Sequence, residues 1–314
     1  MAEVALLYNP AAGGGGRVAA TLAAFARAFG AQAPVLATAA DEDGQDLLVA
    51  GLRALPPTAT VCIAGGDGTL HAALQAVAAA RGNESWFRLA LVPVGSANDG
   101  ARALATLTGR SHGADVEVEL QAIAARVAAG DRGHSADVGV AEAASGARRW
   151  FANFAAAGSP ADWAALSARP WIGRIKRHSV RAAYQLCNLG VIARRRLHEV
   201  GVALDDAASE THTVFAWFAA NARFLGGGLD LGAGVRLDSG RLHVLSIEER
   251  HRWRLVRLLA TTKRGQGQTP VAVERVTLTL PPPARLNLDG ELWHLADTGA
   301  EVTLRVERGR VRWL

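Results

Sequence analysis

A glycine-rich turn, Gly65–Thr69 (Gly-Gly-Asp-Gly-Thr), carries residues suited to phosphate chemistry. It follows an apolar run, 61–64, and precedes a helix-favouring run, 71–80. A turn between a buried strand and a helix presents unpaired backbone N–H groups and the positive end of a helix dipole, which suits phosphate. Asp67 would lie beside that phosphate, so we expect its carboxylate to bind through Mg²⁺ or to accept a hydroxyl proton. The alternative is a turn in which Asp67 caps the following helix.

A second polar loop, 93–102, follows another apolar run and reads Pro-Val-Gly-Ser-Ala-Asn-Asp-Gly-Ala-Arg. Ser96 and Asn98 have side chains that can bind phosphate or ribose. Asp99 can cap a helix or orient a metal-bound water.

A third loop begins with Asn9 and Pro10 and continues into four glycines, 13–16. Its backbone again offers donors to phosphate, although a surface loop without function has the same composition. None of the loops matches the two standard nucleotide-binding fingerprints, G-x-x-x-x-G-K-[ST] and G-x-G-x-x-G.

Two carboxylates, Asp289 and Glu291, flank Gly290 near the end of the chain. In an extended segment they point the same way, because side chains alternate with a period of two. One could then act as a base while the other orients it or holds a cation. The alternative is an Asp-Gly hairpin turn followed by a solvated glutamate.

Alternating strands and helices position the first three loops. We expect strands at 4–8, 33–37, 60–64 and 88–92, and helices at 17–29, 43–55 and 71–80. Thr38 ends the second strand. The carboxyl ends of parallel strands share one edge of a sheet, so the loops should converge on one crevice.

After about residue 110 the pattern changes to strand-like runs with longer gaps, at 116–120, 135–140, 150–157, 213–219, 241–247 and 271–280. The tail, 302–314, looks like two short strands with a turn at Gly309. We therefore predict a doubly wound α/β nucleotide-binding domain followed by a β-rich, sandwich-like domain. We expect the nucleotide-binding domain at 1–125, the β-rich domain, which would bind the substrate, at 126–300, and a tail at 301–314. The tail either extends from the second domain or packs back on the first.

The composition is that of a globular protein: half of the 314 residues are hydrophobic and a fifth are charged. Cys62 and Cys187 form neither a disulfide framework nor a zinc spacing, and the sequence shows no secretory signal, so we expect a cytoplasmic protein. The net charge of +5 favours anionic partners, either nucleotide phosphates, an anionic lipid surface or nucleic acid. A basic surface that is merely solvated is the alternative.

Basic and apolar residues alternate between Gly173 and Val200. A basic amphipathic helix of this kind can rest on the inner face of an anionic membrane. The alternative is a helix packed on the sheet with a charged outer face.

These motifs, in this order, resemble the diacylglycerol kinase catalytic-domain superfamily, with soluble bacterial lipid kinases, relatives of sphingosine and ceramide kinases, as the nearest likeness. The resemblance covers nearly the whole chain. Besides the loops above it includes Phe151–Ala152–Asn153 with Gly158, Gly226–Gly227–Gly228 followed by Asp238–Ser239–Gly240, and Asp289–Gly290–Glu291.

The resemblance implies a fold like that of NAD kinase and diacylglycerol kinase, with a cleft between its domains, and transfer of the γ-phosphoryl group of ATP to a lipid hydroxyl. Asp289 would be the general base, with Glu291 in support. Mg²⁺ would arrive with ATP, placed by Asp67, which we count among the catalytic residues, and Asp99. The predicted nucleotide-binding residues are Asn9, Pro10, Gly13, Thr38, Gly65, Gly66, Asp67, Gly68, Thr69, Ser96, Asn98 and Asp99.

The chain departs from the family pattern in several places. Ser96 stands for the usual Thr, and the Pro that follows Gly-Gly-Gly in the family is missing, with Ala233 near its place. His71–Ala72 replaces the usual Asn-Glu, and His71 could donate to a phosphate or cap the helix. Ser239 replaces the second Asp of D-D-G, which ligates a structural Mg²⁺ in some members. A hydroxyl is a far poorer ligand for a hard cation than a carboxylate, so we expect that metal site to be weak or empty.

Two other functions share part of this evidence. An NAD kinase would share the Gly-Gly-Asp-Gly-Thr turn, and a nucleotide-binding pseudokinase would act by interaction. The expected partners are a lipid substrate and an anionic membrane surface, with a homodimer as one option. No aromatic-interleaved basic motif supports a nucleic-acid partner.

Overall fold

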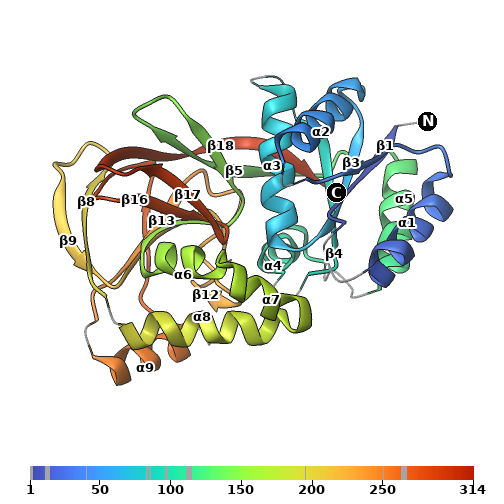
Figure 1. The fold of residues 1–314 in the computed structure, drawn as a ribbon. Coiled ribbons are helices and arrows are strands. Elements are labelled where there is room, and N and C mark those ends of the chain that lie inside the picture. The colour runs from blue at the N-terminus through green and yellow to red at the C-terminus, as the bar shows by residue number, and fades with distance from the viewer. Residues whose placement is uncertain are drawn as a thin grey trace. The chain divides into compact units, whose positions relative to one another are not determined.

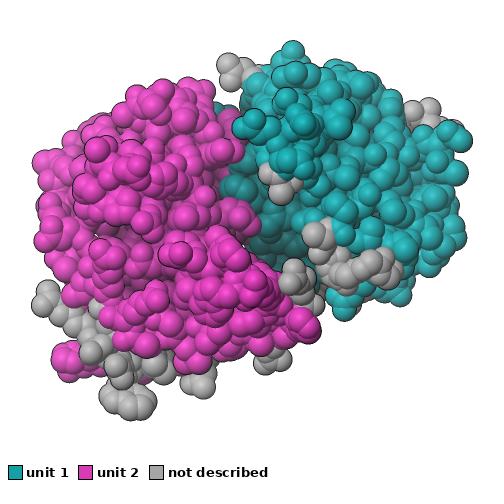
Figure 2. All heavy atoms as spheres, in the orientation of Figure 1, with its two compact units in different colours: residues 1–138, 307–314 teal, residues 139–306 magenta. Residues whose placement is uncertain are grey.

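The computed structural model describes residues 3–10, 15–39, 41–82, 84, 86–95, 98–110, 115–194, 196–249, 251–262 and 267–314. The chain divides into two compact units (Figures 1 and 2). Unit 1 is made of residues 1–138 and 307–314, and unit 2 of residues 139–306. The chain passes between the units inside two strands, β5 (His134–Ala143) and β18 (Ala300–Trp313).

Unit 1 is built on a parallel sheet with the strand order β2-β1-β3-β4. These strands are β1 (Val4–Tyr8), β2 (Val35–Ala37), β3 (Thr60–Gly65) and β4 (Arg88–Pro93). Every residue of β3 is buried, as expected for a central strand covered on both faces.

Helices cover both faces of this sheet (Figure 1). The helices are α1 (Gly15–Phe29), α2 (Glu42–Ala54), α3 (Asp67–Arg81), α4 (Asp99–Thr108) and α5 (Val116–Ala128). On one face, Phe25 of α1 and Ile123 of α5 pack against alternate strand residues such as Leu6 and Cys62. The other face is covered by α2 and α3 (Figure 1). Unit 1 is thus doubly wound, as the sequence predicts.

Helix α5 corrects one sequence prediction, because residues 116–120 were expected to form a strand. The five residues Val-Glu-Val-Glu-Leu alternate with a period of two, but Leu120 and Ile123 are spaced for a helix and are both buried. Asp115 caps this helix, and its carboxylate accepts the backbone N–H groups of Glu117 and Val118.

Besides a two-stranded sheet of β11 and β12, the described part of unit 2 contains two larger antiparallel sheets. One runs β14-β13-β10-β7-β16-β17, and the other contains β18, β15, β8 and β9 in that order, with β5 beside β18 and β6 beside β5. The strands are β6 (Arg148–Phe151), β7 (Phe154–Gly158), β8 (His198–Leu204), β9 (Glu210–Val214), β10 (Ala216–Ala220), β11 (Phe224–Leu225), β12 (Leu229–Asp230), β13 (Leu242–Ile247), β14 (Val271–Val273), β15 (Arg275–Leu280), β16 (Ala284–Leu288) and β17 (Glu291–Ala296).

The core of unit 2 lies between these two sheets. Trp217 of β10 and Leu286 of β16 meet Val202 of β8 and Leu278 of β15 in one buried cluster. This packing of sheet on sheet is the sandwich that the strand-like runs predict. Arg223, just before β11, and Asp230 of β12 form a bidentate ion pair with N–O distances of 2.6 and 2.7 Å.

The helices that the structure describes in unit 2 are α6 (Ser159–Ser167), α7 (Pro170–His178), α8 (Val180–Arg194) and α9 (Arg252–Thr262). Val191 of α8 and Leu255 of α9 pack with the outer face of the six-stranded sheet, which contributes Phe154 and Phe218. The basic stretch between Gly173 and Val200 contains the end of α7, the whole of α8 and the start of β8. No helix among the described residues is long and apolar enough to cross a bilayer.

The tail differs from the expected pair of short strands. β18 is one continuous strand in which Gly309 has a φ of +60°, so the glycine bends the strand without ending it. Its last residues pair in parallel with β4, and the N–H of Leu314 donates to the carbonyl of Leu89 at 2.8 Å. The last eight residues therefore belong to unit 1.

Candidate functional site

The first three polar loops begin at one edge of the unit 1 sheet. In the strand register Tyr8 lies beside Ala64, and Gly65 lies beside Pro93. The N–H of Thr38 donates to the carbonyl of Tyr8 at 2.8 Å, so the end of β2 lies at the same edge. The loops that follow β1, β2, β3 and β4 therefore leave the sheet side by side.

Two of these loops touch through glycine backbones. A Cβ atom on Gly95 would overlap the Cα of Gly66, so no side chain fits there without a shift of the backbone. A Cβ on Gly66 would lie 3.0 Å from the Cα of Gly95. Glycine is therefore required at position 95, and a side chain at position 66 would need Gly95 to shift by a few tenths of an ångström.

Helix α3 begins inside the Gly65–Thr69 turn, four residues earlier than the sequence predicted. Gly66 is its N-cap, and since glycine has no side chain it cannot accept the first backbone N–H groups of the helix. Gly68 in the first turn is exposed, whereas Thr69 is buried. An uncapped helix N-terminus with an exposed first turn suits an anion.

Asp67 binds the backbone of the neighbouring loop. Its Oδ2 accepts the N–H of Asp99 at 3.2 Å, and its Oδ1 accepts the N–H of Gly100 at 2.9 Å. These are the first two residues of α4, so Asp67 caps α4. The alternative in which Asp67 caps the helix that follows it, α3, was therefore wrong: Asp67 caps α4.

The start of α4 carries two further polar side chains. Asp99 is 4% exposed and pairs with Arg102 at 2.7 Å. Asn98 adopts a left-handed conformation, and its Nδ2 donates to the carbonyl of Gly95 at 3.0 Å. Within the described residues the Asn98 Oδ1 is buried and has no hydrogen-bond partner. An orphaned acceptor at this edge is suited to a ligand that supplies a donor or a cation.

The remaining predicted nucleotide residues differ in how far the structure describes them. Asn9 is half-buried and Pro10 is exposed. Gly13 and Ser96 lie outside the described residues. His71 lies inside α3, buried, with its Nε2 3.4 Å from the Nε2 of Gln75, so it does not cap the helix.

Asp289 of unit 2 is held by backbone amides. Its Oδ2 accepts the N–H of Ala152 at 2.7 Å, and its Oδ1 accepts those of Asn153 and Phe154 at 2.8 and 2.9 Å. The N–H of Asp289 donates in turn to the carbonyl of Phe154 at 3.0 Å. These bonds fasten the turn after β16 to the segment between β6 and β7.

The segment around Asp289 and Glu291 is a hairpin turn, not an extended strand. Asp289 and Gly290 have φ angles of +55° and +101°, and Leu288 pairs with Glu291 across the turn. Asp289 is 6% exposed, while Glu291 lies on the surface. The expectation that both carboxylates share one face of an extended segment was wrong, because positive φ values at two successive residues reverse the chain.

Asn221 is a site residue that the sequence reasoning missed. It is fully buried, and its Nδ2 donates to the carbonyl of Ala152 at 2.8 Å, while its backbone N–H donates to the carbonyl of Asn153 at 2.8 Å. It therefore supports the same segment that holds Asp289. The signal was a polar residue at the end of the apolar run 216–220.

The segment around Ser239 forms a local network of its own. Asp238 makes two bonds of 2.8 Å with Arg236, and this partner lowers the pKa of the Asp238 carboxyl. The Ser239 hydroxyl lies 3.3 Å from the Nε2 of His243, whose pKa is lowered by burial and by the charge of Arg241. Among the described residues no group of three or more His, Cys, Asp or Glu side chains could hold a metal ion. The weak structural metal site stays a prediction.

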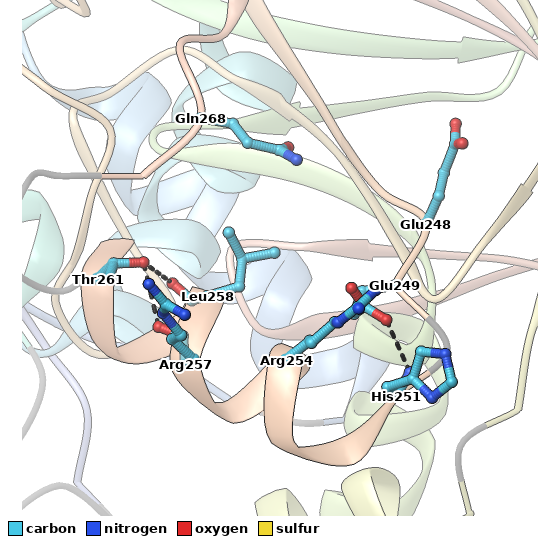
Figure 3. A pocket seen from close by; sticks show the side chains of 8 residues that line it. All are labelled: Glu248, Glu249, His251, Arg254, Arg257, Leu258, Thr261 and Gln268. Atoms are coloured by element: carbon cyan, nitrogen blue, oxygen red, sulfur yellow. Dashed lines mark hydrogen bonds between the residues drawn. The ribbon is translucent and has the colours of Figure 1, made fainter.

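A pocket of about 670 Å³ lies beside α9 (Figure 3). Its lining mixes both charges and consists of Glu248, Glu249, His251, Arg254, Arg257, Leu258, Thr261 and Gln268. None of these is among the residues predicted for nucleotide binding or catalysis.

Comparisons with known proteins give the same two-part division. A family model for the diacylglycerol kinase catalytic domain matches residues 3–139, and one for the YegS C-terminal NAD kinase beta sandwich-like domain matches residues 165–302. No curated protein sequence matches the chain.

Solved structures resemble the chain over nearly all its length. A structure of a diacylglycerol kinase from Bacillus anthracis str. Sterne is 19% identical with a TM-score of 0.68, covering 99% of this chain and 96% of that one. Yeast NADH kinase complexed with NADH is 10% identical with a TM-score of 0.55, covering 99% of this chain and 82% of that one. These likenesses concern the fold, and the predicted fold class is confirmed.

Proposed function

Because the chain belongs to the diacylglycerol kinase catalytic-domain superfamily, we propose that it is an ATP-dependent lipid kinase that phosphorylates a lipid hydroxyl. The observation that carries the proposal is the edge of the unit 1 sheet, where the Gly66–Gly95 contact and the bonds of Asp67 join two phosphate-type loops. The acceptor would be a diacylglycerol-like or sphingoid-like lipid, which combines an apolar body with an exposed hydroxyl.

The edge of unit 1 would bind the nucleotide. The first backbone N–H groups of α3 would receive phosphate oxygens, since Gly66 leaves them without a side-chain cap. Asn9 and Thr38 would complete the binding edge from the ends of β1 and β2. The close glycine contact supports this role, because it holds the backbones of Gly66 and Gly95 together before a nucleotide binds.

Oxygen donors at this edge fit a hard cation. They are the carboxylates of Asp67 and Asp99 and the orphaned amide oxygen of Asn98. Mg²⁺ bound with the nucleotide would neutralise charge on its β- and γ-phosphates. Asp67 would act chiefly as a positioning residue, because its two oxygens hold the start of α4.

Asp289 would accept the proton of the lipid hydroxyl. The hydroxyl oxygen would form a bond to the γ-phosphorus, the bond from that phosphorus to the oxygen of ADP would break, and the proton would pass to the Asp289 carboxylate. The three amides fix the direction of this carboxylate. Each carboxylate oxygen can accept more than one hydrogen bond, so orientation by amides is compatible with accepting a proton.

The test is transfer of label from γ-³²P-ATP, with Mg²⁺, to lipids presented singly in detergent micelles. Candidate acceptors are diacylglycerol, monoacylglycerol, a sphingoid base, ceramide and phosphatidylglycerol, with NAD assayed in parallel. We expect label on one class of lipid. Label on NAD alone would replace the proposal by an NAD kinase activity.

The matched variants are Asp289→Asn and Glu291→Gln. We expect Asp289→Asn to abolish transfer while retaining ATP binding, measured by calorimetry, and Glu291→Gln to reduce transfer less. Transfer at the wild-type rate by a folded Asp289→Asn protein would remove Asp289 from the mechanism. ATP binding with no transfer to any acceptor, in the wild-type protein, would favour the pseudokinase.

A further inference from the structure

The stretch between Asp162 and Glu199 is exclusively basic among its charged residues. It contains eight arginines and lysines and no aspartate or glutamate: Arg169, Arg174, Lys176, Arg177, Arg181, Arg194, Arg195 and Arg196. Arg169, Arg174, Arg194 and Arg196 are exposed. This stretch comprises most of α6, all of α7 and α8, and the loop before β8.

The same stretch exposes large apolar side chains. Trp171 of α7 is 46% exposed, and Leu186 and Leu189 of α8 are 40% and 64% exposed. Among the α8 residues whose exposure is described, the charged one is Arg194, at the last position. Other exposed positions of α8 include Ala182, Gln185 and Ala193.

Packing inside unit 2 does not require these apolar side chains. Ala183 and Cys187 of α8 pack with Ile172 of α7 in a small buried cluster, and Val191 packs toward the sheet. Helix α8 thus buries one apolar stripe against unit 2 and carries a second stripe, Leu186 and Leu189, in water. Exposed aliphatic and tryptophan side chains beside arginines are typical of helices that lie in a membrane interface.

We propose that α7 and α8 are the surface by which unit 2 docks on an anionic lipid bilayer. Trp171, Leu186 and Leu189 enter the boundary between headgroups and acyl chains, while Arg174 and Arg194 contact anionic headgroups. The proposal deepens the proposed function, since the bilayer would supply the lipid acceptor.

Charge selects the bilayer over a second copy of the chain. A symmetric dimer through this face would bring exposed arginines such as Arg174 and Arg194 against the same residues of the second copy, with no acidic residue in the stretch to compensate. An anionic bilayer offers the complementary charge and an apolar layer to receive the tryptophan and leucines.

The test is co-sedimentation of the full chain with vesicles, without ATP. One set contains phosphatidylcholine and phosphatidylglycerol at 70:30, and the other contains phosphatidylcholine alone. We expect binding to the anionic vesicles that weakens as salt is raised, and little binding to the neutral ones. Failure to bind the anionic vesicles at low salt would overturn the proposal.

Two double variants separate the charged and apolar contributions. Arg174→Glu/Arg194→Glu should lower the partition coefficient at least about 30-fold, because each basic residue near such a surface contributes about 1 kcal/mol and 1.4 kcal/mol is tenfold. Leu186→Ser/Leu189→Ser should also weaken binding, with the salt dependence retained.

A matched control makes the same charge change on unit 1. Arg110 and Arg132 are exposed, so Arg110→Glu/Arg132→Glu should bind vesicles like the wild type. Equal loss of binding in this control would show that net charge alone drives adsorption and would overturn the docking surface. So would a wild-type dimer that Leu186→Ser/Leu189→Ser makes monomeric in sedimentation.

Kinase activity is measured separately, on a short-chain acceptor below its micelle concentration. The docking variants should phosphorylate this dissolved acceptor like the wild type. Vesicle binding without any kinase activity would refute the proposed function and leave the docking surface supported. Activity on the dissolved acceptor without vesicle binding would support the proposed function and refute the docking surface.

Discussion

Replacing Asp289 by asparagine should destabilise unit 2 as well as stop transfer. The carboxylate accepts backbone N–H groups from Ala152, Asn153 and Phe154, which come from a segment about 136 residues away in sequence. Asparagine has nearly the same shape but only one acceptor oxygen. In the better orientation that oxygen keeps two of the bonds, and its NH₂ group then faces the N–H of Ala152.

The size of the effect follows from these bonds. A hydrogen bond to a charged group contributes about 1.5–3 kcal/mol, and a buried donor left without a partner costs about 1–3 kcal/mol. At Ala152 the lost hydrogen bond and the unpaired N–H describe the same change, so their free energies are not added. The hydrogen bonds from Asn153 and Phe154 remain but weaken, because their acceptor is no longer charged. We therefore expect a loss of about 2–4 kcal/mol in the free energy of unfolding of unit 2.

Two measurements check this prediction. Urea unfolding should show an earlier transition for Asp289→Asn, and hydrogen exchange should be faster in a peptide covering residues 150–158. Glu291→Gln is the control, since its exposed side chain should change stability by no more than about 0.5 kcal/mol. An unchanged transition together with unchanged exchange in that peptide would refute the structural role of the carboxylate.

Three further predictions concern other parts of the chain. Gly95→Ala should weaken binding of an ATP analogue in calorimetry and destabilise unit 1 by about 1–3 kcal/mol, because the new Cβ meets the backbone of Gly66. Gly234→Ala is the control and should have neither effect, since its Cβ meets no atom within 4 Å. Asp230→Asn should cost about 1–2 kcal/mol at pH 7. The bond from its arginine partner lowers the pKa of Asp230 from 3.8, so urea unfolding should show this difference in full above pH 4 and lose it as the pH falls through the lowered pKa. Burial raises the pKa of Cys62 to about 12, so its thiol should react with Ellman's reagent only after unfolding, and rapid labelling of Cys62 in the native protein would contradict the packing of β3.

The sequence could predict most of unit 1 because its signals are local. Apolar strands such as 4–8 and 60–64, each followed by a glycine-rich turn and a helix, specify a parallel α/β sheet without knowledge of distant contacts. The prediction failed at 116–120, where five residues fit a period of two and only the longer window to Ile123 reveals a helix. It also failed at Gly309, since glycine in a strand is compatible with either a turn or a bend.

The contacts of the predicted site residues could not be read from the sequence. Asp67 binds amides 32 and 33 residues further along the chain, and Asp289 binds amides 135 to 137 residues earlier. Periodicity and motif spacing carry no information about such pairs. The motifs therefore indicated which carboxylates matter but could not indicate what they touch.

These contacts change how loss of activity should be interpreted. Asp67 fixes the start of α4, and Asp289 fixes a hairpin to the segment before β7, so each has a structural role that does not depend on chemistry. A substitution at either position can therefore abolish phosphoryl transfer by displacing backbone. A proton-accepting role for Asp289 is separable from this effect because it changes the chemical step, so Asp289→Asn should retain nucleotide affinity in unit 1 while transfer is lost. A substitution of Asp67 should instead weaken nucleotide binding. Asp67 holds the start of α4, and the loop before α4 contains Gly95, which contacts Gly66 of the predicted phosphate-binding turn.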